Sequence, residues 1–262
     1  MPSAPWGSPG CAISNPNCFS RTWSLSRQPT GCSSPEYWQV NALHYGLGKR
    51  LFPSAASFHL GHDKVEMTRA FQSVCPEHVP WTEIAASTDV EVERLLDEFP
   101  LPFVAKEVRN SMGQGVHLID SAAAFREYAH QNPVLYVQEY LPIDRDLRVV
   151  VIGDEVVAAY WRIAEPGQFH TNVACGGQVS FGAIPVQALE LVAGVAARLG
   201  VDHAGFDVAC VDGHYYLLEF NVLFGNQGLA AQRVSMPERI LDYLVRRGGV
   251  PTGPDHCPPA VA

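Results

Sequence analysis

From about residue 102 onward the sequence is a series of short apolar runs separated by turn residues, and this spacing limits the folds that the chain can adopt. Two pairs of such runs each flank a Gly-Asp or Asp-Gly turn, at 153–154 and 212–213. Turns of this composition between strand-like runs predict β-hairpins. No apolar run approaches the roughly 18 to 20 residues that a membrane span needs. The pattern therefore predicts a protein of antiparallel hairpins and short helices.

Apolar spacing and end signals place the remaining elements. Helices are predicted over 63–74, 88–98, 121–130, 185–199 and 236–247. Strands are predicted over 102–108, 116–119, 134–140, 147–152, 156–163, 203–211 and 214–220. Glycine-bearing polar loops follow at 109–115 and 165–180. We expect residues 1–30 to be poorly ordered and 36–58 to form an irregular packed segment.

Charge and composition exclude several classes of protein. The 27 acidic and 18 basic residues give a net charge of −9, which argues against a nucleic-acid-binding surface. Apolar residues make up 47% and charged residues 17%, as in ordinary soluble proteins. The seven cysteines are odd in number and form no C-x-x-C pair, and no secretory signal is recognisable. We therefore expect a cytoplasmic protein that does not bind a membrane.

The second hairpin contains the most informative polar residues. Glu219 and Asn221 are two apart, so a strand directs both to one face of its sheet. Asp207 joins that face if the turn has an odd number of residues, as it does if 211–213 form a three-residue loop. Two carboxylates and an amide oxygen suit Mg²⁺. The alternative is a set of ordinary polar residues on a solvated face.

A second candidate site lies at the end of the strand that contains Lys106. The loop that follows contains Ser111, Gly113 and Gly115, which allow backbone N–H groups to approach phosphate oxygens. Lys106 would supply a compensating positive charge. The alternative is a simple hairpin turn, because the loop lacks the spacing of a P-loop and the strand–helix context of a Rossmann motif.

Further polar residues follow in the next strands. Residues 137–141 end a buried strand and could offer backbone groups to an adenine and a carboxylate to a ribose. Asp146 and Arg148 share one strand face, and such a pair is most often a surface ion pair worth under about 1 kcal/mol. Arg162 lies in an apolar strand, so it needs an anionic partner.

Taken in order, these motifs resemble the ATP-grasp superfamily, and within it the RimK-like ligases. The resemblance covers about residues 59–246. Its motifs are Asp63-Lys64, Val104–Lys106 with Ser111–Gly115, Val137–Leu141, Asp146–Arg148, Val151–Ala159, Arg162, Phe169–Asn172, Gly176-Gly177, Gly205–Asp207 and Glu219–Asn221. Each motif is weak alone, but their shared order and spacing are specific.

The resemblance implies an α+β, ATP-grasp fold in which a nucleotide lies between the antiparallel sheets of two α+β lobes. The expected division is an irregular, shortened N-terminal region at 1–58, an ATP-grasp domain at 59–247 and a flexible tail at 248–262. Within the ATP-grasp domain, the lid lobe would occupy about 76–140 and the metal-binding lobe about 141–247.

The resemblance also assigns roles to individual residues. The nucleotide would be bound by Lys64, Lys106, Ser111, Gly113, Gly115, Glu139, Tyr140, Leu141, Asp146, His170 and Thr171. The catalytic residues would be Arg148, Arg162 and Asn172. Asp207, Glu219 and Asn221 would bind two Mg²⁺ ions, with Mn²⁺ as a substitute.

The implied function is an ATP- and Mg²⁺-dependent ligase that joins a carboxylate to an amine, such as an amino acid or peptide, through an acyl phosphate. A homo-oligomer is left open. The main alternative is an ATP-binding regulatory or partner module with impaired catalysis. It is favoured by the short region before Asp63 and by His170 and Cys175, which stand where relatives have basic residues. A third alternative is phosphoryl transfer to an acceptor other than a carboxylate.

Overall fold

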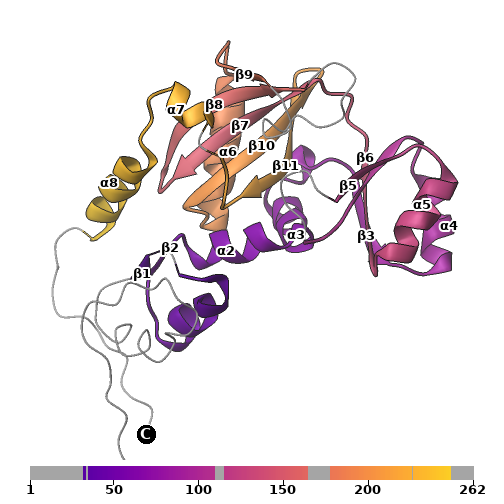
Figure 1. Cartoon of the computed structure of the whole chain (residues 1–262), viewed down its shortest axis with the longest axis horizontal. Coiled ribbons are helices and arrows are strands. Elements are labelled where there is room, and N and C mark those ends of the chain that lie inside the picture. The colour runs from indigo at the N-terminus through magenta and orange to yellow at the C-terminus, as the bar shows by residue number, and fades with distance from the viewer. Residues whose placement is uncertain (1–31, 34, 110–114, 165–177, 226, 249–262) are drawn as a thin grey trace, which may run out of the picture.

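Two antiparallel sheets form the framework of the protein. A computed structural model describes residues 32–33, 35–109, 115–164, 178–225 and 227–248. Within these ranges one sheet has five strands in the order β11-β10-β7-β8-β9, and another has four in the order β3-β6-β4-β5. Figure 1 shows the two sheets side by side, with α3 between them.

The five-stranded sheet is built from the two predicted hairpins and one added edge strand. Its strands are β7 (Arg145–Ile152), β8 (Glu155–Ile163), β9 (Gln178–Ser180), β10 (His203–Val211) and β11 (His214–Asn221). In the β10–β11 turn, Asp212 has φ +50° and Gly213 has φ +81°. Two successive left-handed residues give the tight turn that best matches the twist of paired strands.

The four-stranded sheet is covered on one face by two helices. Its strands are β3 (Thr82–Ala86), β4 (Phe103–Lys106), β5 (Val116–Ile119) and β6 (Val134–Glu139), and its helices are α4 (Asp89–Glu98) and α5 (Ala122–Gln131). The side chains of Thr88 and Ser121 cap the two helices by accepting backbone N–H bonds. Leu95 and Phe125 pack on Phe103 and Leu135 in one core. The other face of this sheet is left to meet α3.

Helix α3 (Lys64–Val74) joins the two sheets. Asp63 caps it by accepting hydrogen bonds from the N–H groups of Val65 and Glu66. Phe71 is buried against Phe206 and Phe220 of the five-stranded sheet. On its other side, the Thr68 hydroxyl lies 2.6 Å from the Tyr136 hydroxyl of the four-stranded sheet. The placement of each sheet relative to the other therefore depends on this helix.

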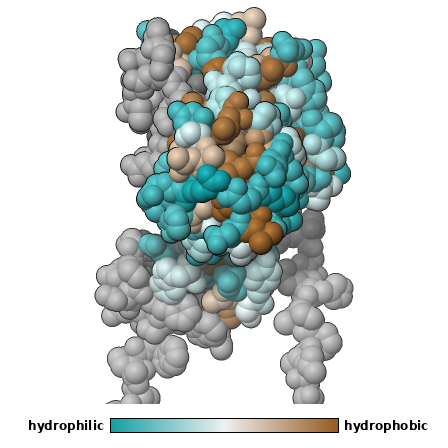
Figure 2. All heavy atoms as spheres, turned by 90° about the vertical axis from the view of Figure 1, so that its right-hand side faces the viewer, coloured by the Kyte–Doolittle hydropathy of each residue, from teal (hydrophilic) through white to brown (hydrophobic). Residues whose placement is uncertain are grey.

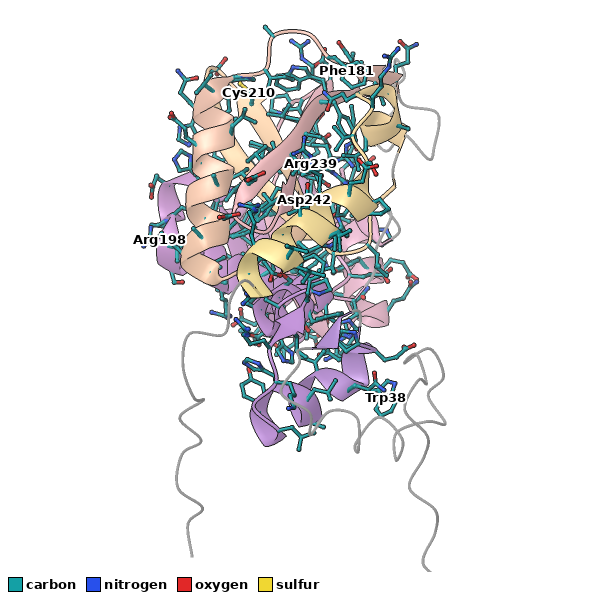
Figure 3. All side chains as sticks on the ribbon, turned by 90° about the vertical axis from the view of Figure 1, so that its left-hand side faces the viewer. Trp38, Phe181, Arg198, Cys210, Arg239 and Asp242 are labelled. Carbon is teal, nitrogen blue, oxygen red and sulfur yellow. The ribbon has the colours of Figure 1, made fainter. Side chains whose placement is uncertain are left out.

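Opposite faces of the five-stranded sheet pack against different helices. α6 (Val186–Leu199) covers the face that presents Val149 and Val151. α7 (Gln227–Ala231) and α8 (Met236–Gly248) lie over the face of Val150. Figure 3 shows α8, with Arg239 and Asp242 labelled, lying across the sheet on the side away from α6, where Arg198 is labelled. The two faces of this sheet therefore belong to different apolar cores.

The segment before α3 forms its own small cluster and is tied to the main body by hydrogen bonds. It consists of β1 (Cys32–Ser33), η2 (Tyr37–Gln39), η3 (Ala42–Gly46), β2 (Leu51–Phe52) and α2 (Ala55–His62), and η4 (Pro76–His78) follows α3. The Ser54 N–H donates to Asp202 Oδ1 at 2.6 Å, and Arg247 Nη1 donates to Asp202 Oδ2 at 2.9 Å. Asp202 therefore joins this segment to α8.

All the predicted helices and strands are confirmed to within a few residues. The prediction missed α2, which begins inside the segment expected to be irregular, and it also missed β3, β9 and α7. α2 contains Gly61 and two histidines and has little amphipathic character, so periodicity did not reveal it. The proposed domain boundaries stay a prediction.

The outer surface of α4 and α5, which cover the four-stranded sheet, faces solvent. Figure 2, which views the molecule from that side, shows mostly hydrophilic residues with scattered apolar groups. Arg94 and Arg126 there form exposed ion pairs with glutamates of α4. None of the helices in the described ranges is long and apolar enough to cross a membrane.

We expect Phe71→Ala to lower the free energy of unfolding by about 3–5 kcal/mol, because it leaves a cavity between α3 and the five-stranded sheet. Phe71 is 1% exposed, whereas Val245 is 65% exposed and gives a control in Val245→Ala, expected to change stability by under about 0.5 kcal/mol. Urea unfolding followed by circular dichroism measures both. Equal losses for the two variants would contradict the packing described for α3.

Candidate active site

One face of the five-stranded sheet gathers acidic and basic side chains from neighbouring strands. Asp146 is the register partner of Arg162, and Arg148 is the partner of Asp207. Directly opposed residues in antiparallel strands point to the same side of the sheet. All four residues are buried. The sheet therefore holds a cluster of two carboxylates and two guanidinium groups.

The geometry of this cluster satisfies each charge. Arg162 donates to both oxygens of Asp146 at 2.6 Å, and its Nη2 is 2.9 Å from Asp207 Oδ2. Arg148 donates to Asp207 Oδ1 at 2.5 Å and Oδ2 at 3.2 Å. Burial disfavours the charged form of Arg162, but Asp207 and Asp146 outweigh that effect and raise the pKa of its guanidinium. The expected anionic partner of Arg162 is confirmed, and the reading of Asp146 and Arg148 as a surface ion pair is wrong.

Asp207 and Glu219 share a sheet face, although for a different reason from the one predicted. The turn holds two residues, because Val211 pairs with His214, so a three-residue loop at 211–213 is wrong. A β-bulge between Asp207 and Val208 shifts the register, and Asp207 then pairs with Glu219. The bulge shifts the pairing by one residue, which is the shift that an extra residue in the turn was expected to produce.

The carboxylate of Glu219 lies between a neighbouring amide and a lysine. Its Oε1 accepts a 3.0 Å hydrogen bond from Asn221 Nδ2. Its Oε2 is 3.9 Å from Nζ of Lys64, which is buried in the first turn of α3. Lys64 is placed there because its own N–H donates to the Val108 carbonyl, which fixes the start of the helix.

Lys106 reaches the same region from the four-stranded sheet. Its Nζ donates to Gln138 Oε1 at 2.7 Å and lies 5.6 Å from the centre of the Tyr136 ring. Burial lowers the pKa of Lys106 to about 8; the charge of Lys64 adds to this effect, and those of Glu219 and Asp207 oppose it. Lys64, Glu219 and Asp207 are thus the charged groups that act on Lys106, and Lys64 and Asp207 are each direct neighbours of Glu219.

Gly115 is the described end of the loop that was predicted to bind phosphate. It has φ +72°, and its carbonyl accepts a 2.7 Å hydrogen bond from the Glu107 N–H, which closes the β4–β5 hairpin. Ser111 and Gly113 lie outside the described residues, as do His170, Thr171, Asn172 and Cys175. Their assignments stay predictions.

The residues predicted to contact adenine and ribose follow β6. Glu139 Oε1 accepts a 2.7 Å hydrogen bond from the N–H of Trp81, and Tyr140 is partly exposed. Leu141 accepts a backbone hydrogen bond from Ile143 at 2.9 Å. This segment leads directly into β7, so it connects the two sheets beside the charged cluster.

Gly205 and Phe224 lie against the Arg148 side chain, and the sequence indicated neither contact. A Cβ on Gly205 would lie 2.8 Å from Arg148 Nη1 and 3.1 Å from Cγ of Phe224. The Phe224 ring lies 5.9 Å from the Arg148 guanidinium carbon. Gly205 therefore leaves the space in which Arg148 and Phe224 meet, a contact that no local sequence signal reveals.

The donor set fits a magnesium ion bound together with phosphates. Within the described ranges, no group of three or more His, Cys, Asp or Glu side chains is arranged to hold a metal by itself. Asp207, Glu219 and Asn221 share one face, and Asp207 and Glu219 are direct register partners. Mg²⁺ commonly takes one or two carboxylates and completes its shell with waters and substrate phosphates. Four cationic side chains nearby, from Lys64, Lys106, Arg148 and Arg162, suit a polyanionic ligand.

Comparison with known proteins agrees with this arrangement. Residues 71–244 match the RimK-like ATP-grasp domain. The chain belongs to the RimK-like ATP-grasp family. The ribosomal protein bS6–L-glutamate ligase of Escherichia coli O139:H28 is 33% identical over 188 residues, covering 65% of this chain and 62% of that protein. This RimK-like chain thus spans about three fifths of the length of the curated relatives it matches.

Solved structures show the same fold. A RimK domain ATP-grasp protein of Sphaerobacter thermophilus DSM 20745 has 19% identity and a TM-score of 0.62, covering 80% of this chain and 76% of that chain. The ATP-grasp ligase PsnB, complexed with minimal precursor, Mg and ADP, has 19% identity and a TM-score of 0.59, covering 78% of this chain and 64% of that chain. The α+β fold predicted for this RimK-like chain is confirmed.

We expect Asp146→Asn to lower the free energy of unfolding by about 3–5 kcal/mol, because it removes one of the two carboxylates that pair with the buried Arg162. The exposed pair between Arg126 and Glu93 provides a control: Arg126→Gln should cost under about 1 kcal/mol. Urea unfolding of both variants measures the difference. A small and similar loss in both would show that the charged cluster is solvated in solution.

Proposed function

We propose that this protein is an ATP-dependent ligase that joins a carboxylate to the amino group of an amino acid. The observation that carries the proposal is the meeting of buried lysines and carboxylates at the junction of the two sheets. Lys64 and Lys106 come from outside the five-stranded sheet, whereas Asp207 and Glu219 belong to it. A triphosphate with a divalent cation is a ligand that satisfies both sets of charges.

In the first step, a substrate carboxylate oxygen attacks the γ-phosphorus of ATP. The bond between that phosphorus and the bridging oxygen breaks, which yields ADP and an acyl phosphate. Lys64 and Lys106 bind phosphate oxygens, and Arg162 offsets the charge that builds up on the transferring group. Asp146 orients Arg162 through its two hydrogen bonds.

In the second step, the amine nitrogen attacks the acyl carbon. The bond from that carbon to the phosphate oxygen breaks, inorganic phosphate leaves and the nitrogen loses a proton, so an amide forms. Arg148 lies beside the site and offsets charge on the carbonyl oxygen as the tetrahedral species forms. The sheet thus supplies fixed positive charge for both steps.

Asp207, Glu219 and Asn221 would hold the magnesium ions, and Mn²⁺ could replace them. Bound there, the cation would neutralise charge on the β- and γ-phosphates during transfer. The three residues fit this role because hard oxygen donors on one rigid strand pair need little rearrangement.

L-Glutamate is the proposed amine substrate, and a peptide or protein carboxylate is the proposed acceptor of phosphate. Two relatives, a probable α-L-glutamate ligase and the bS6–L-glutamate ligase, support this choice. PsnB, which has also been solved with the precursor peptide PsnA2, supports a peptide substrate. We place the reaction in the cytoplasm, where ATP is available.

Glu219→Gln is expected to lower glutamate-dependent ADP release by about 100-fold or more, because the site loses one of its carboxylates. The unfolding midpoint should stay close to that of the unsubstituted protein, since Glu219 is only partly buried. Glu127→Gln, at an exposed position of α5, is the matched control and should keep full turnover. A coupled ADP assay with a panel of amino acids and peptides measures both.

Two results would overturn the proposal in different ways. Mg-ATP binding without ADP release on any amine and carboxylate would indicate a binding module without catalysis. Release of ADP with a phosphorylated product that contains no new amide, identified by mass spectrometry, would indicate transfer to another acceptor.

We expect the affinity for Mg-free ATP to fall as the pH rises through about 8, because Lys106 is charged below its pKa and neutral above it. Bound phosphates favour the charged form, so binding should take up a proton at higher pH, and affinity should fall about tenfold for each pH unit above 8. Titration calorimetry in two buffers measures the affinity and the proton uptake. Lys106→Met should lose this pH dependence, and its persistence in that variant would assign it to another group.

A further inference from the structure

A chain of three buried polar groups ends on Lys106. The Thr82 hydroxyl donates to the Pro80 carbonyl at 2.6 Å. Gln138 Nε2 donates to the same hydroxyl oxygen at 2.8 Å, and Gln138 Oε1 accepts from Lys106 Nζ at 2.7 Å. The chain therefore runs from a backbone carbonyl of the segment before β3 to the ammonium group beside the candidate active site.

The chemistry of the two ends fixes the direction of every bond. A carbonyl oxygen only accepts, so the Thr82 hydroxyl donates its single proton to the Pro80 carbonyl. It can then only accept a hydrogen bond from Gln138. The amide of Gln138 must then turn its NH₂ group to Thr82 and its oxygen toward Lys106. An ammonium group only donates, so Lys106 requires the same orientation. Both ends thus select one of the two orientations of this amide.

Because these groups are buried, the orientation of the Gln138 amide affects how well Lys106 is hydrogen-bonded. Thr82 is 8% exposed, Gln138 is 4% exposed and Lys106 is 7% exposed, so water has little access to replace a missing partner. The sheet supports the arrangement, because Gln138 is the register partner of Thr82 on one side and of Val104 on the other. Val104 is two residues before Lys106, so all three polar side chains project from the same face.

We propose that Thr82 is a positioning residue for Lys106 and acts through the amide of Gln138. This inference rests on the proposed function, in which Lys106 binds phosphate. With the Thr82 hydroxyl present, the amide oxygen holds the ammonium group on the side facing Glu219 and Asp207. Without it, the buried NH₂ group of Gln138 loses its acceptor, so the amide is held less firmly and no longer keeps the ammonium group in one position.

The charged groups near Lys106 exert the same electrostatic effect on it whether or not the Thr82 hydroxyl is present. Lys106 faces Glu219 on β11, Asp207 on β10 and Lys64 on α3, and Thr82 contacts none of these side chains in the described bonds. Tyr136 also lies beside Thr82, Gln138 and Lys106, but its hydroxyl is held 2.6 Å from that of Thr68, so the hydrogen-bonded route from Thr82 to Lys106 runs through Gln138 and the other charges stay in place. This separation is what makes the role testable.

The test compares Thr82→Val with Thr82→Ser by measuring the dissociation constant of Mg-free ATP by titration calorimetry. Valine has nearly the shape of threonine but no hydroxyl, and binding should weaken about fivefold to tenfold. Serine keeps the hydroxyl and should restore affinity to within about twofold of the unsubstituted protein. Equal weakening by serine and valine would assign the effect to packing and overturn the inference.

A double-mutant cycle with Lys106→Met tests whether the effect passes through the lysine. Once the ammonium group is gone, adding Thr82→Val should change ATP affinity no further. An additive loss in the double variant would show that Thr82 acts by another route. If Thr82→Val does not fold, Gln138→Met replaces it in the same cycle with the same expectation.

The outcome also separates this inference from the proposed function. If Lys106→Met binds ATP as tightly as the unsubstituted protein, the phosphate role of Lys106 fails, and the proposed function loses its main support. If Lys106→Met weakens binding but Thr82→Val and Gln138→Met do not, only the positioning role fails.

Discussion

The paired guanidinium and carboxylate groups on the five-stranded sheet are the interaction on which the rest of the site depends. Burying Arg148 and Arg162 is costly unless each charge meets an opposite charge in good geometry. The register of three antiparallel strands supplies that geometry, since it sets Asp146 opposite Arg162 and Arg148 opposite Asp207. The same hydrogen bonds that make the burial tolerable also fix the orientation of a proposed metal ligand.

The second constraint is the meeting of two separate sheets. Helix α3 ties the sheets together, because Phe71 packs in the apolar core of the five-stranded sheet and the Thr68 hydroxyl meets that of Tyr136 on the four-stranded sheet. Glu219 of the five-stranded sheet lies 3.9 Å from Lys64, and Glu219 and Asp207 oppose the lowering of the Lys106 pKa that burial causes. A bound triphosphate would strengthen this arrangement by adding negative charge between the two faces.

Much of the fold could be predicted from the sequence, because hairpin turns and apolar periodicity are local signals. The residue types at 106, 207, 219 and 221 also led to the prediction of a phosphate-binding lysine and a magnesium site. The partners of those residues could not be predicted in the same way. The bulge that aligns Asp207 with Glu219 leaves no signal in composition, and the prediction therefore placed the extra residue in the turn instead.

Contacts between strands that are distant in the sequence could not be predicted either. Thr82 belongs to a short strand that the prediction missed, so nothing indicated that its hydroxyl meets Gln138. The sequence likewise does not show that the side chain of Arg148 lies directly against Gly205, where a Cβ atom would not fit. Both cases depend on tertiary packing rather than on local propensity.

A crystal structure with Mg²⁺ and a non-hydrolysable ATP analogue tests the central claim most directly. The account predicts a cation at about 2.0–2.1 Å from oxygens of Asp207, Glu219 and Asn221, with Nζ of Lys106 on the phosphates. A cation held away from that strand pair, or a nucleotide bound elsewhere with Lys106 still on Gln138 alone, would contradict it.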